Sequence, residues 1–225
     1  MFLRGFVMLG LVVVPTVFAG GRVGAAPSGG ASPEIPFAFV ANLGQAPKDV
    51  RFVGNGPGFR AQFREGGVTV HQAGASARIT FANGAAHPLI EALEPTGATA
   101  NYLRGGDSDK WLSGLPFYRM VRYRGVWPGI EIRFKGEAAK AKAEYVVEPG
   151  ASVDTIRLRF DGHAEVAVDG RLIVRSAAGE FREDPPYLYQ ERDGSRVTVG
   201  GAFRIHHDGT VGFTVAEWDH SLPLV

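Results

Sequence analysis

The sequence predicts an all-β protein in which antiparallel strands pack as a β-sandwich-like fold. Two observations predict it: apolar and polar residues alternate along many short runs, and Asp-Gly dipeptides separate several of these runs. Successive side chains of a strand point to opposite faces, so alternation gives each strand one apolar and one solvated face. This is typical of antiparallel sheets, and strand-sized runs that recur about every 8–12 residues indicate a sandwich or barrel.

Four runs show the alternation most clearly. In residues 130–135, Ile130, Ile132 and Phe134 occupy every second position, and charged residues stand between them. Residues 59–64, 156–161 and 211–216 follow the same period of two. We expect each run to be a strand whose apolar side faces the core.

Turn signals separate the runs. Asp169-Gly170, Asp193-Gly194 and Asp208-Gly209 each lie between two strand-like runs, and residues 55–58 read Asn-Gly-Pro-Gly. Asp-Gly supplies the positive φ that tight hairpin turns require. These positions therefore predict hairpins between the flanking strands.

Helix signals are weak. Residues 136–145 hold good helix formers but lack a capping residue and an apolar stripe, so we interpret them as a hairpin loop. Residues 87–95 are bounded by prolines, which predicts an edge strand. Residues 105–117 are turn-rich and would be the seam if the fold had two β lobes. We favour one continuous unit over residues 37–225, because residues 105–117 lack the composition of a linker.

The N-terminus predicts export. A short basic start precedes an apolar run of about fifteen residues, shorter than the roughly 20 that span a membrane. We expect a signal peptide at residues 1–26, cleaved after Ala26 or alternatively after Ala19, and no membrane span in the mature chain. Residues 27–36 are small, polar and Pro-rich, which predicts a disordered lead-in. The expected location is extracellular or at the cell surface, with the periplasm as the alternative.

Charge and cysteine content exclude several classes. Without residues 1–26 the chain has 199 residues with 22 basic and 23 acidic side chains, and this near-neutrality argues against nucleic-acid partners. The sequence has no Cys, which excludes disulfides, thiolate zinc sites and Cys nucleophiles. Stability must therefore come from the core, for which this length suffices.

An ordered set of segments resembles a domain of unknown function found in exported bacterial proteins. The segments are FVANLGQAPKDVRFVGNGPGF (39–59), NYLRGGDSDKWLSGLPFYRMVRYRGVWPGIEIRF (101–134), EYVVEPGASVDTIRLRFDG (144–162), YLYQERDG (187–194) and DHSLPLV (219–225). The resemblance covers residues 37–225. It implies a module that stands ahead of β-propeller-type repeats, called SBBP repeats, in large cell-surface proteins. This sequence ends at Val225, where such proteins typically continue into the repeats, and the resemblance implies no catalytic residue.

No motif predicts a catalytic residue, a metal site or a cofactor. The serines do not form a G-x-S-x-G elbow, and there is no HExxH. His206 and His207 would point to opposite faces of a strand, and the acids around Ser108 lack the remaining ligands of an EF-hand loop. A glycosidase needs two carboxylates across a sugar cleft, and the sequence offers only unremarkable candidates, namely Glu131, Glu144, Glu180 and Asp184.

Six residues are candidates for binding a ligand. Trp111 and Trp127 would stack on sugars if exposed, although Pro128 and Gly129 place Trp127 at a corner between strands, where we favour a role in the core. Arg122 and Arg124 share a strand face, as do Arg157 and Arg159. On neighbouring strands they would form a cationic patch for acidic polysaccharide or carboxylates of a partner. The alternative, which we favour, is that these arginines pair with acids such as Glu131, Glu144 or Asp161.

The leading hypothesis is a non-catalytic, exported β domain that acts as a structural or interaction module. Its expected partners are β-propeller repeats, another cell-surface protein or a polysaccharide. A carbohydrate-binding module is the first alternative, and a glycan-active hydrolase is the second.

Overall fold

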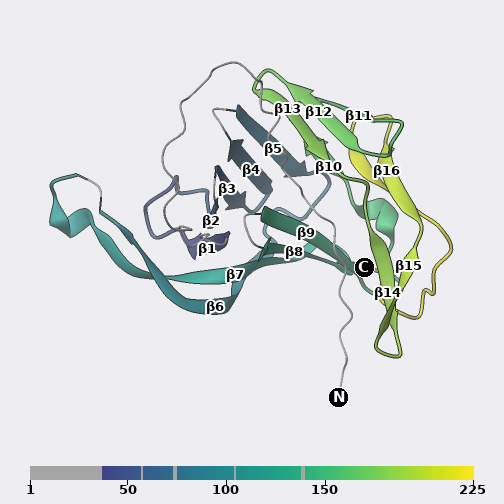
Figure 1. The fold of residues 1–225 in the computed structure, drawn as a ribbon, viewed down its shortest axis with the longest axis horizontal. Coiled ribbons are helices and arrows are strands. Elements are labelled where there is room, and N and C mark those ends of the chain that lie inside the picture. The colour runs from purple at the N-terminus through teal and green to yellow at the C-terminus, as the bar shows by residue number, and fades with distance from the viewer. Residues whose placement is uncertain (1–36, 57, 73–74, 104, 138–139) are drawn as a thin grey trace, which may run out of the picture.

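The computed structural model describes residues 37–225, except residues 57, 73–74, 104 and 138–139 (Figure 1). The predicted signal peptide (1–26) and lead-in (27–36) lie outside the described residues. Within this part the fold is all-β, as predicted. Its only helical segments there are two 3₁₀ turns, η1 (Ser108–Lys110) and η2 (Val153–Thr155).

Twelve antiparallel strands form one large sheet, in the order β16-β17-β10-β5-β4-β3-β2-β1-β7-β8-β9, with β6 beside β7. The bounds are β1 (Ala38–Ala41), β2 (Phe52–Gly56), β3 (Phe59–Arg64), β4 (Gly67–Gln72), β5 (Ala75–Phe81), β6 (Leu89–Tyr102), β7 (Leu112–Trp127), β8 (Ile130–Glu137), β9 (Lys140–Val147), β10 (Leu158–Phe160), β16 (Gly201–Ile205) and β17 (Val211–Val215).

The large sheet folds over on itself, so that its two halves pack face to face around the core (Figure 1). Ring contacts join the halves: Phe63 on β3 meets Phe134 on β8 at 5.0 Å between centroids. Likewise, Tyr145 on β9 meets Phe213 on β17 at 5.6 Å. The alternation of the sequence thus places one side of each strand in a sandwich-like core.

Two small sheets complete the molecule: β11 (His163–Val166), β12 (Leu172–Ser176) and β13 (Gly179–Glu183), and the hairpin of β14 (Leu188–Arg192) and β15 (Ser195–Val199). The first packs on the large sheet through Phe181, whose ring lies 6.2 Å from that of Phe160. The C-terminal residues tie the second in place. Leu224 pairs with Val147 of β9, and Val225 exchanges backbone hydrogen bonds with Tyr189 of β14.

The predicted turns are confirmed. The three Asp-Gly dipeptides connect β11 to β12, β14 to β15, and β16 to β17. Asp193 and Gly194 both have positive φ, 49° and 76°, as a two-residue hairpin turn requires. Residues 55–58 join β2 to β3, although residue 57 is outside the described residues.

Three segments differ from the prediction. Residues 136–145 are largely strand, because Ala141, Ala143 and Tyr145 of β9 alternate into the core. The edge strand expected at 87–95 exists but is much longer, since β6 runs to Tyr102. Residues 105–117 are no seam between lobes: they form the tip of the β6–β7 hairpin and the first part of β7, and strands on both sides of them join the large sheet.

Among the described residues, no helix has the length and apolar character needed to cross a membrane.

Candidate functional site

Charged side chains form a ladder across β6, β7, β8 and β9 on the face opposite the core. Arg122 lies 2.9 Å from Glu91 and 3.9 Å from Glu131, and Arg124 lies 3.3 Å from Glu91. Cross-strand register explains these pairs. Glu91 stands directly opposite Arg122, and the other two pairs join diagonal neighbours on adjacent strands.

The ladder continues across the next strands. Arg133 donates to Glu131, and Lys135 lies 2.8 Å from Glu144. Every cation in this series is therefore matched with a carboxylate, as the favoured interpretation of the arginines holds. The ladder is a network of paired charges rather than an open cationic patch, and its Arg133 and Glu144 are buried.

Arg157 and Arg159 lie elsewhere, beside and on β10. Five strands separate β10 from β7 in the large sheet, so the four arginines do not form one patch. Arg157 donates to the backbone carbonyl of Asp154 at 3.1 Å, and Arg159 donates to that of Asp208 at 3.0 Å. The condition for a shared patch, that these strands are neighbours, is therefore not met, because the pairing order of the strands keeps its two halves apart.

Trp127 belongs to the core, as favoured. Its side chain is 2% exposed, its indole Nε1 donates to the carbonyl of Ala82 at 3.1 Å, and its ring meets Phe81 edge-on. This burial supports the core role that we favoured for Trp127 over a ligand platform. The Trp-Pro-Gly corner between β7 and β8 closes one end of the core.

Trp111 is exposed, at 42%, and follows η1 at the tip of the β6–β7 hairpin. Its indole Nε1 donates to the carbonyl of Gly105 at 3.1 Å. Asp107 caps η1 and pairs with Lys110 at 2.8 Å, so the acids around Ser108 serve a surface turn. The tryptophan is thus held in place on a projecting structure.

That projecting structure, which we call the arm, comprises residues 95–118. There β6 and β7 pair only with each other, apart from a single contact of Tyr118 with Phe39 of β1 (Figure 1). Bulges interrupt the pairing, where Gly97 and Gly114 take positive φ values of 83° and 73°. The arm consequently extends away from the body as a twisted two-stranded ribbon.

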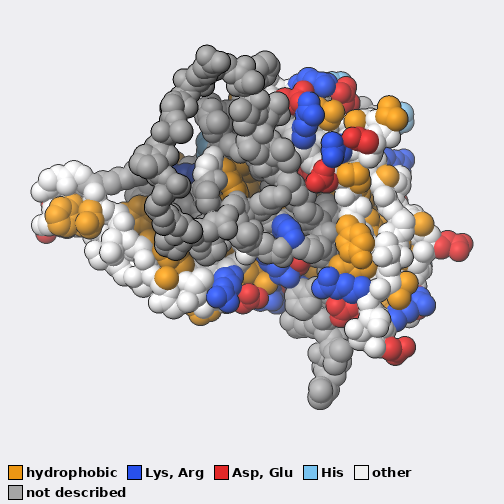
Figure 2. All heavy atoms as spheres, in the orientation of Figure 1, with side chains coloured by type: hydrophobic (Ala, Val, Ile, Leu, Met, Phe, Trp, Pro, Cys, Tyr) orange, Lys and Arg blue, Asp and Glu red, His pale blue; other side chains and the backbone are white. Residues whose placement is uncertain are grey.

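The arm carries an unusual surface. Residues 95–103 and 112–118 of the arm contain no charged side chain. Leu103 is 58% exposed, and apolar side chains gather at the far end of the arm (Figure 2). Exposed strand edges are normally protected by charges, so an uncharged, two-sided edge is suited to pairing with another chain.

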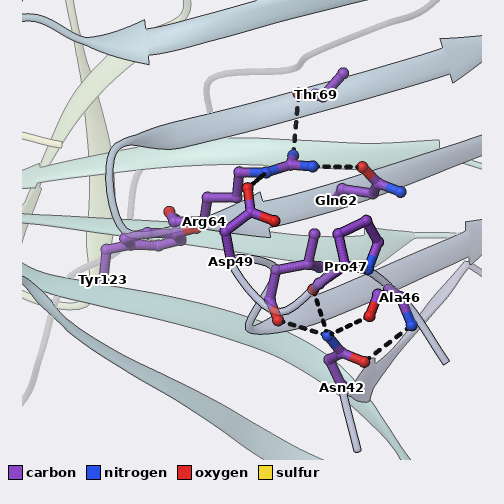
Figure 3. A network of polar contacts seen from close by, with 9 residues as sticks. Asn42, Ala46, Pro47, Asp49, Gln62, Arg64, Thr69 and Tyr123 are labelled. Carbon is purple, nitrogen blue, oxygen red and sulfur yellow. Dashed lines mark hydrogen bonds and ion pairs between the residues drawn. The ribbon is translucent and has the colours of Figure 1, made fainter. Parts of the chain in front are cut away.

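A polar network fixes the loop after β1 (Figure 3). The Asn42 side chain donates to the carbonyls of Ala46, Pro47 and Val50, and its Oδ1 accepts from the backbone N–H of Ala46. These bonds replace those that a strand would supply. The polar residues of FVANLGQAPKDV thus have a structural role.

Arg64 extends this network toward the core. It donates to Asp49 at 2.6 Å, to Gln62 at 2.7 Å and to Thr69 at 3.2 Å (Figure 3). Its own carbonyl accepts from the buried Tyr123 hydroxyl at 2.9 Å. The Arg64 guanidinium also lowers the pKa of Asp49 from its ordinary value. The network therefore links the loop, β3, β4 and β7.

Two open hollows flank the segment 148–154. One of about 400 Å³ is lined by Trp127, Arg124, Glu131 and Glu148. The other, of about 410 Å³, is lined by Trp218, His220, Asp154, Arg204, Phe213 and Val215; we call it the Trp218 hollow. Sequence reasoning missed Trp218, because one aromatic residue in a turn carries no periodic signal.

Each carboxylate considered for a glycosidase pairs with a basic side chain. Glu131 and Glu144 belong to the charged ladder. Glu180 pairs with Arg175 and Arg182, which lower its pKa, and Asp184 pairs with Arg171 at 3.0 Å. Within the described ranges, no three His, Asp or Glu side chains gather as metal ligands would.

Several buried groups titrate unusually. Burial, and to a lesser extent the charge of Asp184, raises the pKa of Glu183 well above its ordinary value. Burial likewise raises the pKa of Tyr189 to about 12. Burial, and then the charges of Arg157 and Arg204, lower the pKa of His206. Glu183 lines an apolar part of the core beside Tyr145, where burial disfavours its charged form.

Comparison with known proteins identifies the family. A family model described as a domain of unknown function (DUF7948) matches residues 39–225, from β1 to the last residue. The comparisons matched no curated protein and no solved structure. The match agrees with the predicted resemblance to a domain of unknown function. The chain belongs to the DUF7948 family.

Proposed function

We propose that the chain is an exported, non-catalytic β domain that acts as an interaction module, and that the arm is the surface it offers to a protein partner. One observation carries the proposal. The arm places two strand edges, free of charged side chains, away from the body of the molecule (Figure 1). The unpaired backbone groups of such edges can form hydrogen bonds with a strand of another chain.

The chemistry of the arm specifies the kind of partner. The unpaired N–H and C=O groups along β6 can pair only with a partner segment whose backbone is extended. The uncharged side chains of the arm favour a partner strand that is also uncharged. Exposed Leu103 and Trp111 would add apolar contact at the far end. β-rich repeats and other cell-surface β proteins supply strands of this kind, in keeping with the resemblance described above.

Site-specific crosslinking in the native host tests the proposal. A photoreactive residue at Leu103 should crosslink one defined β-rich protein, and Thr99→Lys, which places a charge on the edge, should abolish the crosslink. The same photoreactive group at the exposed Val168, between β11 and β12, serves as the matched control. Equal yields from Val168, or crosslinks that join only two copies of the chain, contradict the proposal.

The non-catalytic part of the proposal has a separate test. The purified chain should leave glycosidic, ester and peptide substrates unchanged. Turnover that disappears in Glu131→Gln, with folding retained, would overturn it, because Glu131 is the carboxylate shared by the charged ladder and a hollow.

A further inference from the structure

The Trp218 hollow differs in chemistry from every other surface described above. Its lining includes Arg204 of β16, and β16 lies on the opposite side of the molecule from the arm (Figure 1). One part of its lining is apolar, with Val153, Phe213 and Val215, and another part carries Asp154 and Arg204. Its volume, about 410 Å³, lies in the range of small-molecule sites, which are apolar clefts with a few placed polar groups.

An aromatic wall bounds the hollow. The rings of Trp218 and His220 lie 4.1 Å apart between centroids, inclined by 42°. Trp218 also packs on the core, which fixes its position. A rigid indole at the edge of a cavity presents apolar area together with a polar N–H.

Two polar side chains of the lining retain hydrogen-bonding capacity. Asp154, on η2, and Arg204, on β16, approach to 3.8 Å, which is too long for a hydrogen bond. Both are exposed, with 69% and 52% of their side chains accessible. A planar carboxylate and a planar guanidinium can each bind two neighbouring hydroxyl groups.

We infer that the Trp218 hollow is a binding site for a neutral sugar unit of a polysaccharide. A pyranose has an apolar face of C–H groups and an edge of hydroxyls, which matches an aromatic wall beside a carboxylate and a guanidinium. The single acid and single arginine balance in charge, which favours a neutral sugar over an acidic one. The sequence thus has a place for a carbohydrate, but at Trp218 and not at Trp111 or Trp127.

The inference is tested with soluble neutral polysaccharides. The purified chain is titrated with β-1,3-glucan, β-1,4-xylan, galactomannan and α-1,6-glucan, with acidic polygalacturonate as the contrast, and binding is followed by calorimetry. At least one neutral polysaccharide should bind. Trp218→Ala should weaken that binding by about tenfold, the value of a lost aromatic contact. Trp111→Ala, on the arm, is the matched control and should bind as the original chain does.

Two further variants keep the inference testable if Trp218→Ala does not fold. Arg204→Ala and Asp154→Ala alter exposed side chains and should retain the melting temperature of the original chain, yet each should weaken binding about tenfold. The inference is overturned if no neutral polysaccharide binds at millimolar sugar, if only polygalacturonate binds, or if binding persists unchanged in all three variants. These results are independent of the crosslinking at the arm.

Discussion

The body of the molecule and the arm are built from the same kind of strand but use it differently. In the body, alternate side chains such as Phe63, Tyr123 and Ile132 are at most 1% exposed, and the positions between them carry charges or polar groups. In the arm, the strands pair only with each other and carry no charge. The comparison shows that a strand pattern in the sequence does not predict whether a hairpin packs into the core or projects from the body.

The largest expected difference between the regions concerns large aromatic residues. Phe63 packs against Phe39 and Phe134, at 5.3 and 5.0 Å between ring centroids. Phe63→Ala should lower the free energy of unfolding by about 3–5 kcal/mol through a cavity in the core. Trp111→Ala in the arm should lower it by about 0.5 kcal/mol or less. Urea unfolding of both variants checks this, and similar losses would break the comparison.

Glycine substitutions sharpen the same contrast. A Cβ at Gly136, on β8, would lie 2.0 Å from the carbonyl oxygen of Phe37, so the strand and the N-terminal residue of the fold would have to separate. Gly136→Ala should cost about 1–3 kcal/mol of unfolding free energy. Gly106→Ala, near the tip of the hairpin, meets open space and is the matched control. Thermal unfolding distinguishes them, and an unchanged melting temperature for Gly136→Ala would contradict the close packing.

The buried acid of the body should make stability depend on pH. Because the folded pKa of Glu183 lies above its ordinary value of 4.5, the folded chain keeps a proton that the unfolded chain has released. This contribution is complete below pH 4.5 and is lost as pH rises toward the folded pKa, by up to about 1.4 kcal/mol for each pH unit.

Glu183→Gln should remove this slope and stabilise the chain near neutral pH, as followed by denaturant unfolding between pH 5 and pH 8. Glu180→Gln is the control. Arg182 lowers the pKa of the exposed Glu180, so this side chain does not titrate between pH 5 and pH 8. A slope that survives in Glu183→Gln would show that another group causes it.

A smaller effect is expected in the polar network of the body. Tyr123→Phe removes the hydroxyl that donates to the Arg64 carbonyl and leaves the ring contacts with Phe81 and Phe134 in place. The expected loss is about 1 kcal/mol, the net value of one hydrogen bond. Chemical unfolding measures it. No loss at all would mean that water satisfies the carbonyl equally well.

Local features of the fold were predictable, because they reside in neighbouring residues. Asp-Gly turns marked hairpins, and the alternation in residues 130–135 marked β8. The period of two was also present in Lys140–Tyr145, but its lysines and alanines suited a helix or loop as well as a strand. The length of β6 escaped prediction, because Pro95 and Gly97 interrupt the strand pattern where the structure has a bulge.

The candidate sites depended on long-range pairing and were less predictable. Arg122 and Arg157 had the same local signal, and only the order of strands showed that they lie apart. The Trp218 hollow joins Asp154, Arg204 and Trp218, which are far apart in the chain. No local sequence pattern predicts that these residues meet. The absence of charged residues from 95–103 and 112–118, by contrast, is visible in the sequence itself.

The central claim is that the arm is not needed to hold the body together. Pro95 and Tyr118 stand opposite each other, so residues 96–117 can be replaced by an Asn-Gly turn. The melting temperature of this shortened chain, measured by differential scanning calorimetry, tests the claim directly. We predict one cooperative transition within about 2 °C of the original melting temperature, because none of the removed residues, the buried Leu115 included, belongs to the described core cluster. A fall of about 10 °C or more would contradict the claim and make the arm part of the core.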